Sequence, residues 1–380
     1  MSNRLMRILG IVVILFVLGS TVATSQPQKV PRLTERPLDR AAYVELAKQW
    51  KAYIEKHGES VEALINLGMA YHYSREIEAA MSAGKRAVEI EPDNPYALAF
   101  YAKMLALDFD KADEAIKYLE RSRKIAPDHG EALITLTAAY LKRGELEKSD
   151  AISRTIFDQK IYSRPIQDYA YNMLVGLPNG AVLITNGDTD TFPPLALQQG
   201  MDFRKDVIVI NRHLLNIREY AEALFERYPA IRPSGDIIMK NEKKARTRSR
   251  TLLERMINES RVPVYFAVSV NFGDLGFGEE FYLEGLNKRS SGKMLSAEES
   301  ARLFLETYRM DSATDWSYAW ELVPSYVDIM TNYVTCMINL AQDKDVSAGT
   351  ERGLLEKAME IAEFHEMHRL EGLIRALKKK

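Results

Sequence analysis

A short motif that returns 35 positions later is the sequence feature that most limits how this chain can fold. The segment EIEPDNPYA around Pro92 recurs as KIAPDHGEA around Pro127. Over 41–157 the apolar residues follow the period of a helix throughout. A repeat of this length is typical of solenoids, in which each unit is one supersecondary motif stacked on its neighbours. The N-terminal half therefore predicts a stack of helical hairpins.

Within each unit, the kinds of residue resemble those of tetratricopeptide repeats. Small residues such as Gly68 and Ala80 let two antiparallel helices approach closely, and Pro92 stops the second helix. We predict a leading helix over 42–57 and three units, with one extra residue in the loop 108–111. The matching positions are Leu64, Leu67, Gly68, Tyr71, Ala80, Ala87 and Pro92, then Leu98, Tyr101, Ala102, Ala115 and Pro127, then Leu133, Leu136, Tyr140, Gly144 and Ile156.

The first helices of the three hairpins would form the inner groove of this solenoid, residues 41–160, which is the usual binding surface of such a stack. Ten side chains are predicted to face the groove: Glu62, Ile65, Met69, His72, Tyr96, Ala99, Lys103, Glu131, Ile134 and Ala138. The set is mixed and weakly charged, so we expect it to take a peptide or a partner protein. The alternative is that the solenoid packs on its own C-terminal neighbour and binds nothing else.

Residues 1–25 have the features of a signal peptide. Arg4 and Arg7 precede an apolar run from Ile8 to Leu18, and small residues follow. The run is too short to span a bilayer comfortably as a permanent helix. An uncleaved membrane anchor is the alternative. Both interpretations predict an exported protein, periplasmic or otherwise extracytoplasmic, and only the uncleaved segment would attach it to a membrane. Residues 26–40, rich in proline, are predicted to be a linker.

Strands alternate with helices in the second half of the chain. Apolar, β-branched runs over 181–185, 206–211 and 262–269, and a fourth run over 280–286, are separated by helical patterns from 193, 216 and 245. This order predicts a Rossmann-like parallel α/β domain over 161–322. Residues 323–380 are expected to be helical, with a hairpin formed by 323–342 and 350–365. The predicted fold class is therefore an α-solenoid joined to an α/β domain.

The segment from Tyr169 to Asn216 resembles the soluble extracytoplasmic part of bacterial protein O-mannosyltransferase-like membrane proteins. The similar blocks span about 165–340 and include Tyr169–Leu177, Asn186–Pro193 (NGDTDTFP), Asp206–Asn216, Pro263–Ala267, Tyr282–Leu286 and Asp311–Tyr333. The chain lacks the multispanning region of those proteins, so the resemblance implies an accessory domain and carries over no glycosyl transfer chemistry.

The NGDTDT segment is the candidate ligand site of this domain, because ligands of open α/β sheets collect beyond the carboxyl ends of the strands. Its oxygen-bearing side chains suit Mg²⁺, Ca²⁺ or the hydroxyls of a sugar. The candidate residues are Asn186, Asp188, Thr189, Asp190, Thr191 and, after the next strand, Asn211. Alternatively, the two aspartates cap the following helix. A metal-dependent hydrolase or transferase acting at Asp188 and Asp190 is the third hypothesis.

Charge and cysteine content exclude several other classes. Lys and Arg number 51 against 53 Asp and Glu, a balance that argues against nucleic-acid binding. The cationic run Lys240–Arg250 is interpreted as a basic helix start or a solvated face. Cys336 is the one cysteine, which excludes an intrachain disulfide and a cysteine-rich metal site. The sequence thus favours an exported interaction or scaffold protein without catalysis or cofactor, which binds a peptide, a partner protein or a glycan in the cell envelope.

Overall fold

The computed structural model describes residues 26–30, 38–235, 245–275, 277, 281–290, 294–315 and 324–379. The predicted signal peptide, 1–25, lies outside the described residues, as do residues 240–244 of the basic run that begins at Lys240. The chain divides into two compact units. The first contains Leu38–Pro92 together with 26–30, and the second contains Asp93–Lys380. The last two repeat hairpins therefore belong to the same compact unit as the sheet.

The first unit consists of the leading helix α2 (Arg40–His57) and the hairpin α3 (Val61–Tyr73) and α4 (Ile77–Ile90). These elements confirm the predicted leading helix and first repeat. Ser60 caps α3 by accepting a hydrogen bond from the backbone N–H of Ala63 at 3.2 Å. Ala70 and Ala80 are fully buried between helices, as expected of small residues at a close helix contact.

The second unit opens with two more hairpins, which confirm the remaining repeats. They are α5 (Pro95–Leu105) with α6 (Ala112–Ile125), and α7 (Gly130–Lys142) with α8 (Leu146–Asp158). The predicted extra residue in the loop between α5 and α6 is accommodated by a 3-10 turn, Phe109–Lys111. Asn94 caps α5 by accepting from the N–H of Tyr96 at 3.0 Å.

A five-stranded sheet forms the centre of the second unit, with strand order β2-β1-β3-β5-β4. The strands are β1 (Val182–Thr185), β2 (Ile208–Asn211), β3 (Val264–Ala267), β4 (Tyr282–Glu284) and β5 (Asn287–Arg289). The first three are parallel, but β5 pairs antiparallel with β3 and with β4. The prediction of an all-parallel sheet was therefore wrong. The run predicted as a fourth strand, 280–286, contains only β4, and Gly285, at φ +63°, allows a tight turn after which the chain returns as β5.

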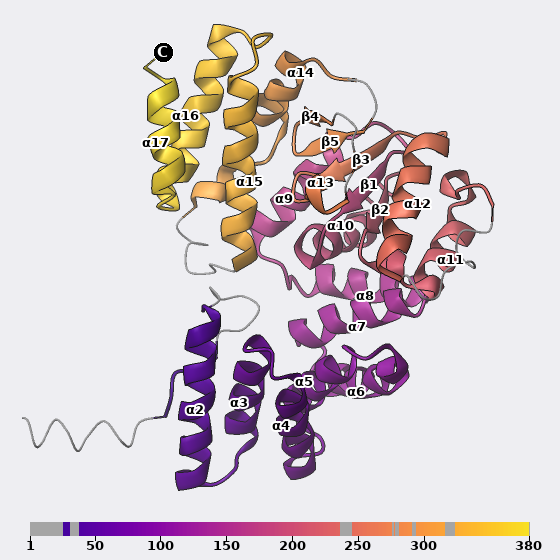
Figure 1. The fold of residues 1–380 in the computed structure, drawn as a ribbon, viewed down its shortest axis with the longest axis vertical. Helices are drawn as coiled ribbons and strands as arrows, with labels where there is room; N and C mark the ends of the chain where they lie inside the picture. The colour runs from indigo at the N-terminus through magenta and orange to yellow at the C-terminus, as the bar shows by residue number, and fades with distance from the viewer. Residues whose placement is uncertain are drawn as a thin grey trace, which may run out of the picture. The chain divides into compact units, whose positions relative to one another are not determined.

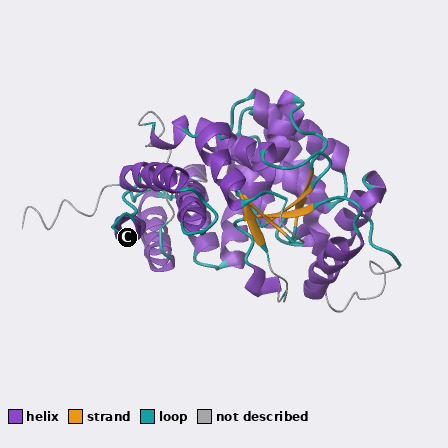
Figure 2. Cartoon of the chain, turned by 90° about the horizontal axis from the view of Figure 1, so that it is seen from above, coloured by secondary structure: helices purple, strands orange, loops and turns teal. Residues whose placement is uncertain are grey.

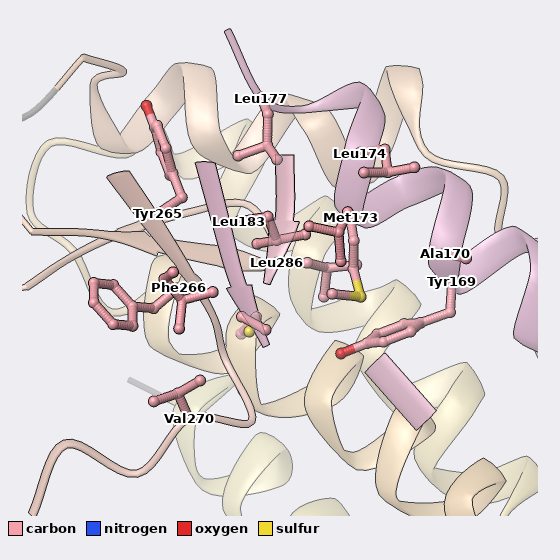
Figure 3. Packing of buried hydrophobic residues seen from close by; sticks show 14 of the residues in the cluster. Tyr169, Ala170, Met173, Leu174, Leu177, Leu183, Tyr265, Phe266, Val270 and Leu286 are labelled. Carbon is pink, nitrogen blue, oxygen red and sulfur yellow. The ribbon is translucent and has the colours of Figure 1, made fainter. Parts of the chain in front are cut away.

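The parallel strands are buried on both faces, as their continuous apolar runs predict. Helix α9 (Arg164–Val175) contributes to this core together with strands β1 and β3. Met173, Leu183 and Leu286 lie close together there (Figure 3). The strands are enclosed by helices in Figure 2. No helix in the described part of the chain is both long and apolar enough to span a bilayer.

The second unit contains eight further α-helices in its described part. They are α10 (Asp188–Met201), α11 (Arg218–Arg227), α12 (Ala245–Glu259), α13 (Phe272–Leu275), α14 (Ala297–Arg302), α15 (Pro324–Ala341), α16 (Ala348–Phe364) and α17 (His368–Leu377). Helices α15 and α16 occupy the positions of the predicted C-terminal hairpin, and α17 is an additional helix (Figure 1). Asn172 ties α9 to α15, because its side-chain amide donates to the Tyr333 hydroxyl at 2.6 Å.

The last repeat hairpin packs directly on the α/β part of the second unit. Phe157 of α8 lies against Gly200 of α10, where a Cβ in place of the glycine hydrogen would meet the ring at 2.1 Å. Arg227 of α11 donates to Asp150 at 2.8 Å and to Glu147 at 2.7 Å, both on α8. The predicted alternative, in which the solenoid packs on its C-terminal neighbour, therefore holds for the third hairpin.

Candidate functional site

The NGDTDT segment forms the start of a helix rather than a free loop. Gly187 is the N-cap of α10, and Asp188, Thr189 and Asp190 form its first turn. The sequence places this helix start near Pro193, because proline is normally found at the first helical position. In the structure Pro193 and Pro194 lie inside α10. That part of the prediction was wrong, because the hydrogen bonds of Asp190 start the helix before the prolines.

Asp190 is a buried carboxylate that accepts hydrogen bonds from several donors. Its Oδ2 accepts from the N–H of Asn186 at 2.8 Å, and its Oδ1 accepts from the N–H of Gly187 at 2.7 Å. Ser269, which follows β3, donates its hydroxyl to the same carboxylate. Burial raises the pKa of Asp190, while these hydrogen bonds oppose the rise. Asp190 therefore caps the start of α10 through the N–H of Gly187, and it also links the end of β1 to the end of β3.

Thr191 and Asn211 belong to a second internal network. The Thr191 hydroxyl lies 2.5 Å from that of Thr185, and it accepts from the Asn211 side-chain amide at 3.1 Å. The Asn211 amide oxygen accepts from the backbone N–H of His213 at 2.9 Å. All three side chains are buried: Thr185, Thr191 and Asn211. They hold β1, β2 and α10 together at the carboxyl edge of the sheet.

Asp188 is different, because its side chain is exposed at this edge. Surrounding protein raises the pKa of its carboxyl, and the charges of Lys142, Lys103 and His213 oppose the rise. Lys142 ends helix α7, and burial lowers the pKa of its ammonium group. The end of α7, which is the first helix of the third repeat, and the first residue of α10 are therefore electrostatically coupled across one polar edge.

Arg212 adds a second cation to this edge. Its Nε donates to the Asn186 side-chain oxygen at 2.6 Å, and its backbone carbonyl accepts from the Ser249 hydroxyl at 2.6 Å. Asn186 is thereby fixed beside the end of β2. Of the six predicted ligand residues, Asp190, Thr191 and Asn211 are buried in internal bonds. Asn186 and Thr189 are partly exposed, and Asp188 is the most accessible.

We expect neither Mg²⁺ nor Ca²⁺ to raise the melting temperature, although both are predicted candidates for Asp188 and Asp190. Both Asp190 oxygens already accept hydrogen bonds, so a cation would have to displace them. Among the described residues, no group of three or more His, Cys, Asp or Glu side chains is placed to hold a metal ion. Differential scanning fluorimetry over a cation titration checks this, since a bound ligand stabilises the native state by mass action. A saturable rise in melting temperature that Asp188→Asn abolishes would support a metal site at Asp188.

The predicted groove residues of the first unit lie on α3. Ile65 and Met69 are buried, Glu62 is exposed and His72 is partly buried. Glu62 pairs with Lys29 at 2.6 Å. Lys29 belongs to an extended segment, residues 26–30, which we call the N-terminal strap and which lies within the predicted linker. The groove side of α3 is therefore in contact with the chain's own N-terminal residues.

The groove residues of the second unit differ among themselves. Lys103 and Glu131 form a largely buried ion pair at 2.7 Å. Ile134 and Ala138 pack against the core around the sheet, which makes them part of the contact between α7 and the α/β part. Ala99 is buried, and Tyr96 is 45% exposed. Tyr96 is therefore the most accessible of the predicted groove residues in this unit.

Two groups of residues at these sites were missed by the sequence reasoning. Trp50 and Asn66 hold the strap, and Lys142 and Arg212 supply charge at the edge of the sheet. Trp50 carries a signal that could have been used, because a tryptophan in a helix needs a partner for its indole N–H when buried. Lys142 and Arg212 carry none, since their neighbours come from distant parts of the sequence.

Comparison with known protein families gives two matches, and both lie in the second unit. Residues 106–159 match the tetratricopeptide repeat family. Residues 166–230 match the family described as TMEM260-associated domain 2, and they fall within the stretch 165–340 that carries the resemblance. No curated protein matches the chain. The fold and these matches together define a helical-repeat protein with a small mixed α/β part.

Proposed function

We propose that this protein is an interaction protein that binds an extended peptide in a slot between α2 and α3. The observation that supports the proposal is the N-terminal strap, because the slot already holds an extended stretch of polypeptide. Tetratricopeptide repeats generally mediate protein–protein contacts, and the family match over 106–159 supports this class of function.

The slot recognises main-chain groups of the strap. Trp50 is fully buried, and its indole N–H donates to the backbone carbonyl of Gln28 at 3.0 Å. The side-chain oxygen of Asn66 accepts from the backbone N–H of Val30 at 2.8 Å. Every peptide of suitable shape offers these two groups, so another extended segment could replace the strap.

Side-chain contacts determine which peptide sequence the slot prefers. Val30 is 2% exposed, so the slot encloses one branched apolar side chain. Lys29, the residue before Val30, pairs with Glu62. This ion pair is exposed and therefore adds little affinity. The peptide that fits best therefore has a basic residue followed by a branched apolar one, and the apolar residue dominates the binding energy.

The cellular setting is part of the same proposal. The signal-peptide features of 1–25 and the resemblance over 165–340 support export to the cell envelope, where the partner would be a protein or peptide. The exposed Asp188, next to Asn186 and Thr189, supports a weak contact with glycan hydroxyls at the edge of the sheet.

Displacement of the strap should open the slot to a peptide in trans. We expect Val30→Asp to undock the strap, because a carboxylate in this enclosed site would lack a partner. A fluorescein-labelled, amidated peptide of residues 26–30 (QPQKV) should then bind the full-length variant in an anisotropy titration. It should bind the unmodified chain at least about tenfold more weakly, because a tethered strap competes at high effective concentration.

Three controls make the result decisive. Gln28→Asp changes an exposed strap side chain and keeps the carbonyl that Trp50 recognises, so this variant should behave as the unmodified chain does. A peptide with aspartate in place of Val30 should not bind, and Asn66→Ala should weaken binding to the Val30→Asp chain. If Val30→Asp unfolds, Val30→Ala replaces it. If the Val30 variant folds but does not bind the peptide, the strap is only a structural element.

A further inference from the structure

A pocket of about 470 Å³ lies beside the carboxyl edge of the parallel strands, within the second unit. Its wall is formed by the end of α5 with the loop after it, the end of α7, the start of α11 and the start of α12. This volume is in the range of small-molecule sites, and the place is where open α/β sheets collect ligands. The peptide slot of the first unit does not share any of these residues.

Positive charge predominates in the pocket. Lys142, Arg218 and Arg248 line it, against the single acid Glu219. Arg218 pairs with Glu222 at 2.8 Å, which offsets part of its charge. Helix α11 also begins here, and its N-cap Ile217 has no side-chain oxygen to cap the first amides. The positive end of the helix therefore adds to the field of the side chains.

Arg248 has donor capacity that the described residues leave unused. One of its terminal nitrogens donates to the backbone carbonyl of Asn216 at 2.8 Å. Its Nε is buried and has no hydrogen-bond partner among the described residues. An unsatisfied, buried guanidinium N–H is costly, and native structures usually satisfy such groups. The Nε itself is enclosed by protein, so an oxyanion in the pocket would accept from the terminal nitrogens of Arg248, which is one of the lining residues.

The pocket lining also includes apolar side chains. Leu107 is 52% exposed, and Phe109 and Ile217 are the other large apolar residues of the lining. A simple ion such as phosphate would use only the cationic lining residues. A ligand that combines an oxyanion with an apolar body would also remove Leu107 from water, which adds binding energy in proportion to the apolar area covered.

We propose that this pocket binds a small organic anion, in which one phosphate or carboxylate group faces Arg248 and Lys142 and an apolar body covers Leu107. The proposal is independent of the peptide slot. It assigns the α/β part a ligand-binding role and places the recognition of the ligand at the junction with the last repeat.

Phenyl phosphate, benzoate and inorganic phosphate are suitable probes, titrated into the full chain by isothermal calorimetry. We expect saturable binding of the two aromatic anions, and tighter binding of phenyl phosphate than of inorganic phosphate. Arg248→Ala should weaken the binding of phenyl phosphate at least about tenfold, because charge-assisted hydrogen bonds are lost. Leu107→Ser should reduce the preference for phenyl phosphate over inorganic phosphate. Comparison of phenyl phosphate with benzoate identifies the preferred anionic group.

The matched control is Arg250→Ala on the same helix. Arg250 is exposed and pairs with Glu254 at 2.8 Å, so its removal should leave binding unchanged. If Arg248→Ala does not fold, Arg248→Lys and Lys142→Gln provide the test. Absence of saturable binding of all three probes up to about 10 mM would overturn the proposal, as would equal affinities in the Arg248 and Arg250 variants.

Discussion

Asp190→Ala is expected to lower the free energy of unfolding by about 3 kcal/mol. The substitution removes the acceptor for the N–H groups of Asn186 and Gly187 and for the Ser269 hydroxyl. Buried donors left without a partner account for most of the loss. Asp190→Asn should cost less, because its amide oxygen can still accept from one backbone N–H. Urea unfolding followed by circular dichroism gives these values.

The neighbouring acid provides the control. Asp188 lies two residues away in the same helical turn, and its side chain is exposed. Asp188→Ala should change stability by no more than about 0.5 kcal/mol, as is usual for surface substitutions. Equal losses in the two variants would contradict the assignment of Asp190 as the capping residue. If Asp188→Ala altered glycan binding and Asp190→Ala did not, the edge of the sheet would be identified as a glycan-binding site.

The helical repeats could be predicted from the sequence because their stabilising contacts are local and periodic. Small residues such as Ala80 mark the helix contacts, and the prolines that end the first two units, Pro92 and Pro127, are 35 positions apart. The three parallel strands were also predictable, since each is a continuous apolar run buried on both faces. The hairpin of β4 and β5 was not, because strands of three residues are too short to show an alternating pattern.

The candidate sites were harder to predict because they depend on contacts between distant residues. Whether Asp190 acts as a cap or as a ligand depends on Ser269, which is 79 positions away. The strap has no periodic pattern, and its docking depends on Trp50 and Asn66, which are 22 and 36 positions from their partners. The pocket beside α12 combines four elements, and no segment of the sequence contains more than a few of its residues.

Gly200→Ala should destabilise the second unit by about 3 kcal/mol, because α8 and α10 approach too closely there for a side chain. A Cβ on Gly200 would lie 2.1 Å from Cγ and 2.6 Å from Cβ of Phe157, so the whole Phe157 side chain would have to move. Gly372→Ala is the matched control, since a Cβ on this glycine of α17 would meet nothing within 4 Å. The control should be neutral or stabilising by up to about 1 kcal/mol, from helix propensity alone.

A double-mutant cycle with Phe157→Ala tests the cause. Removal of the ring creates room for the new methyl group, so Gly200→Ala should cost much less in the Phe157→Ala background than in the unmodified chain. Additive losses would mean that the glycine matters for another reason, such as the backbone of α10 itself. Because this contact joins the last repeat to the α/β part, we also expect the two parts to unfold together. A single cooperative transition, lowered in both single variants, is the expected result.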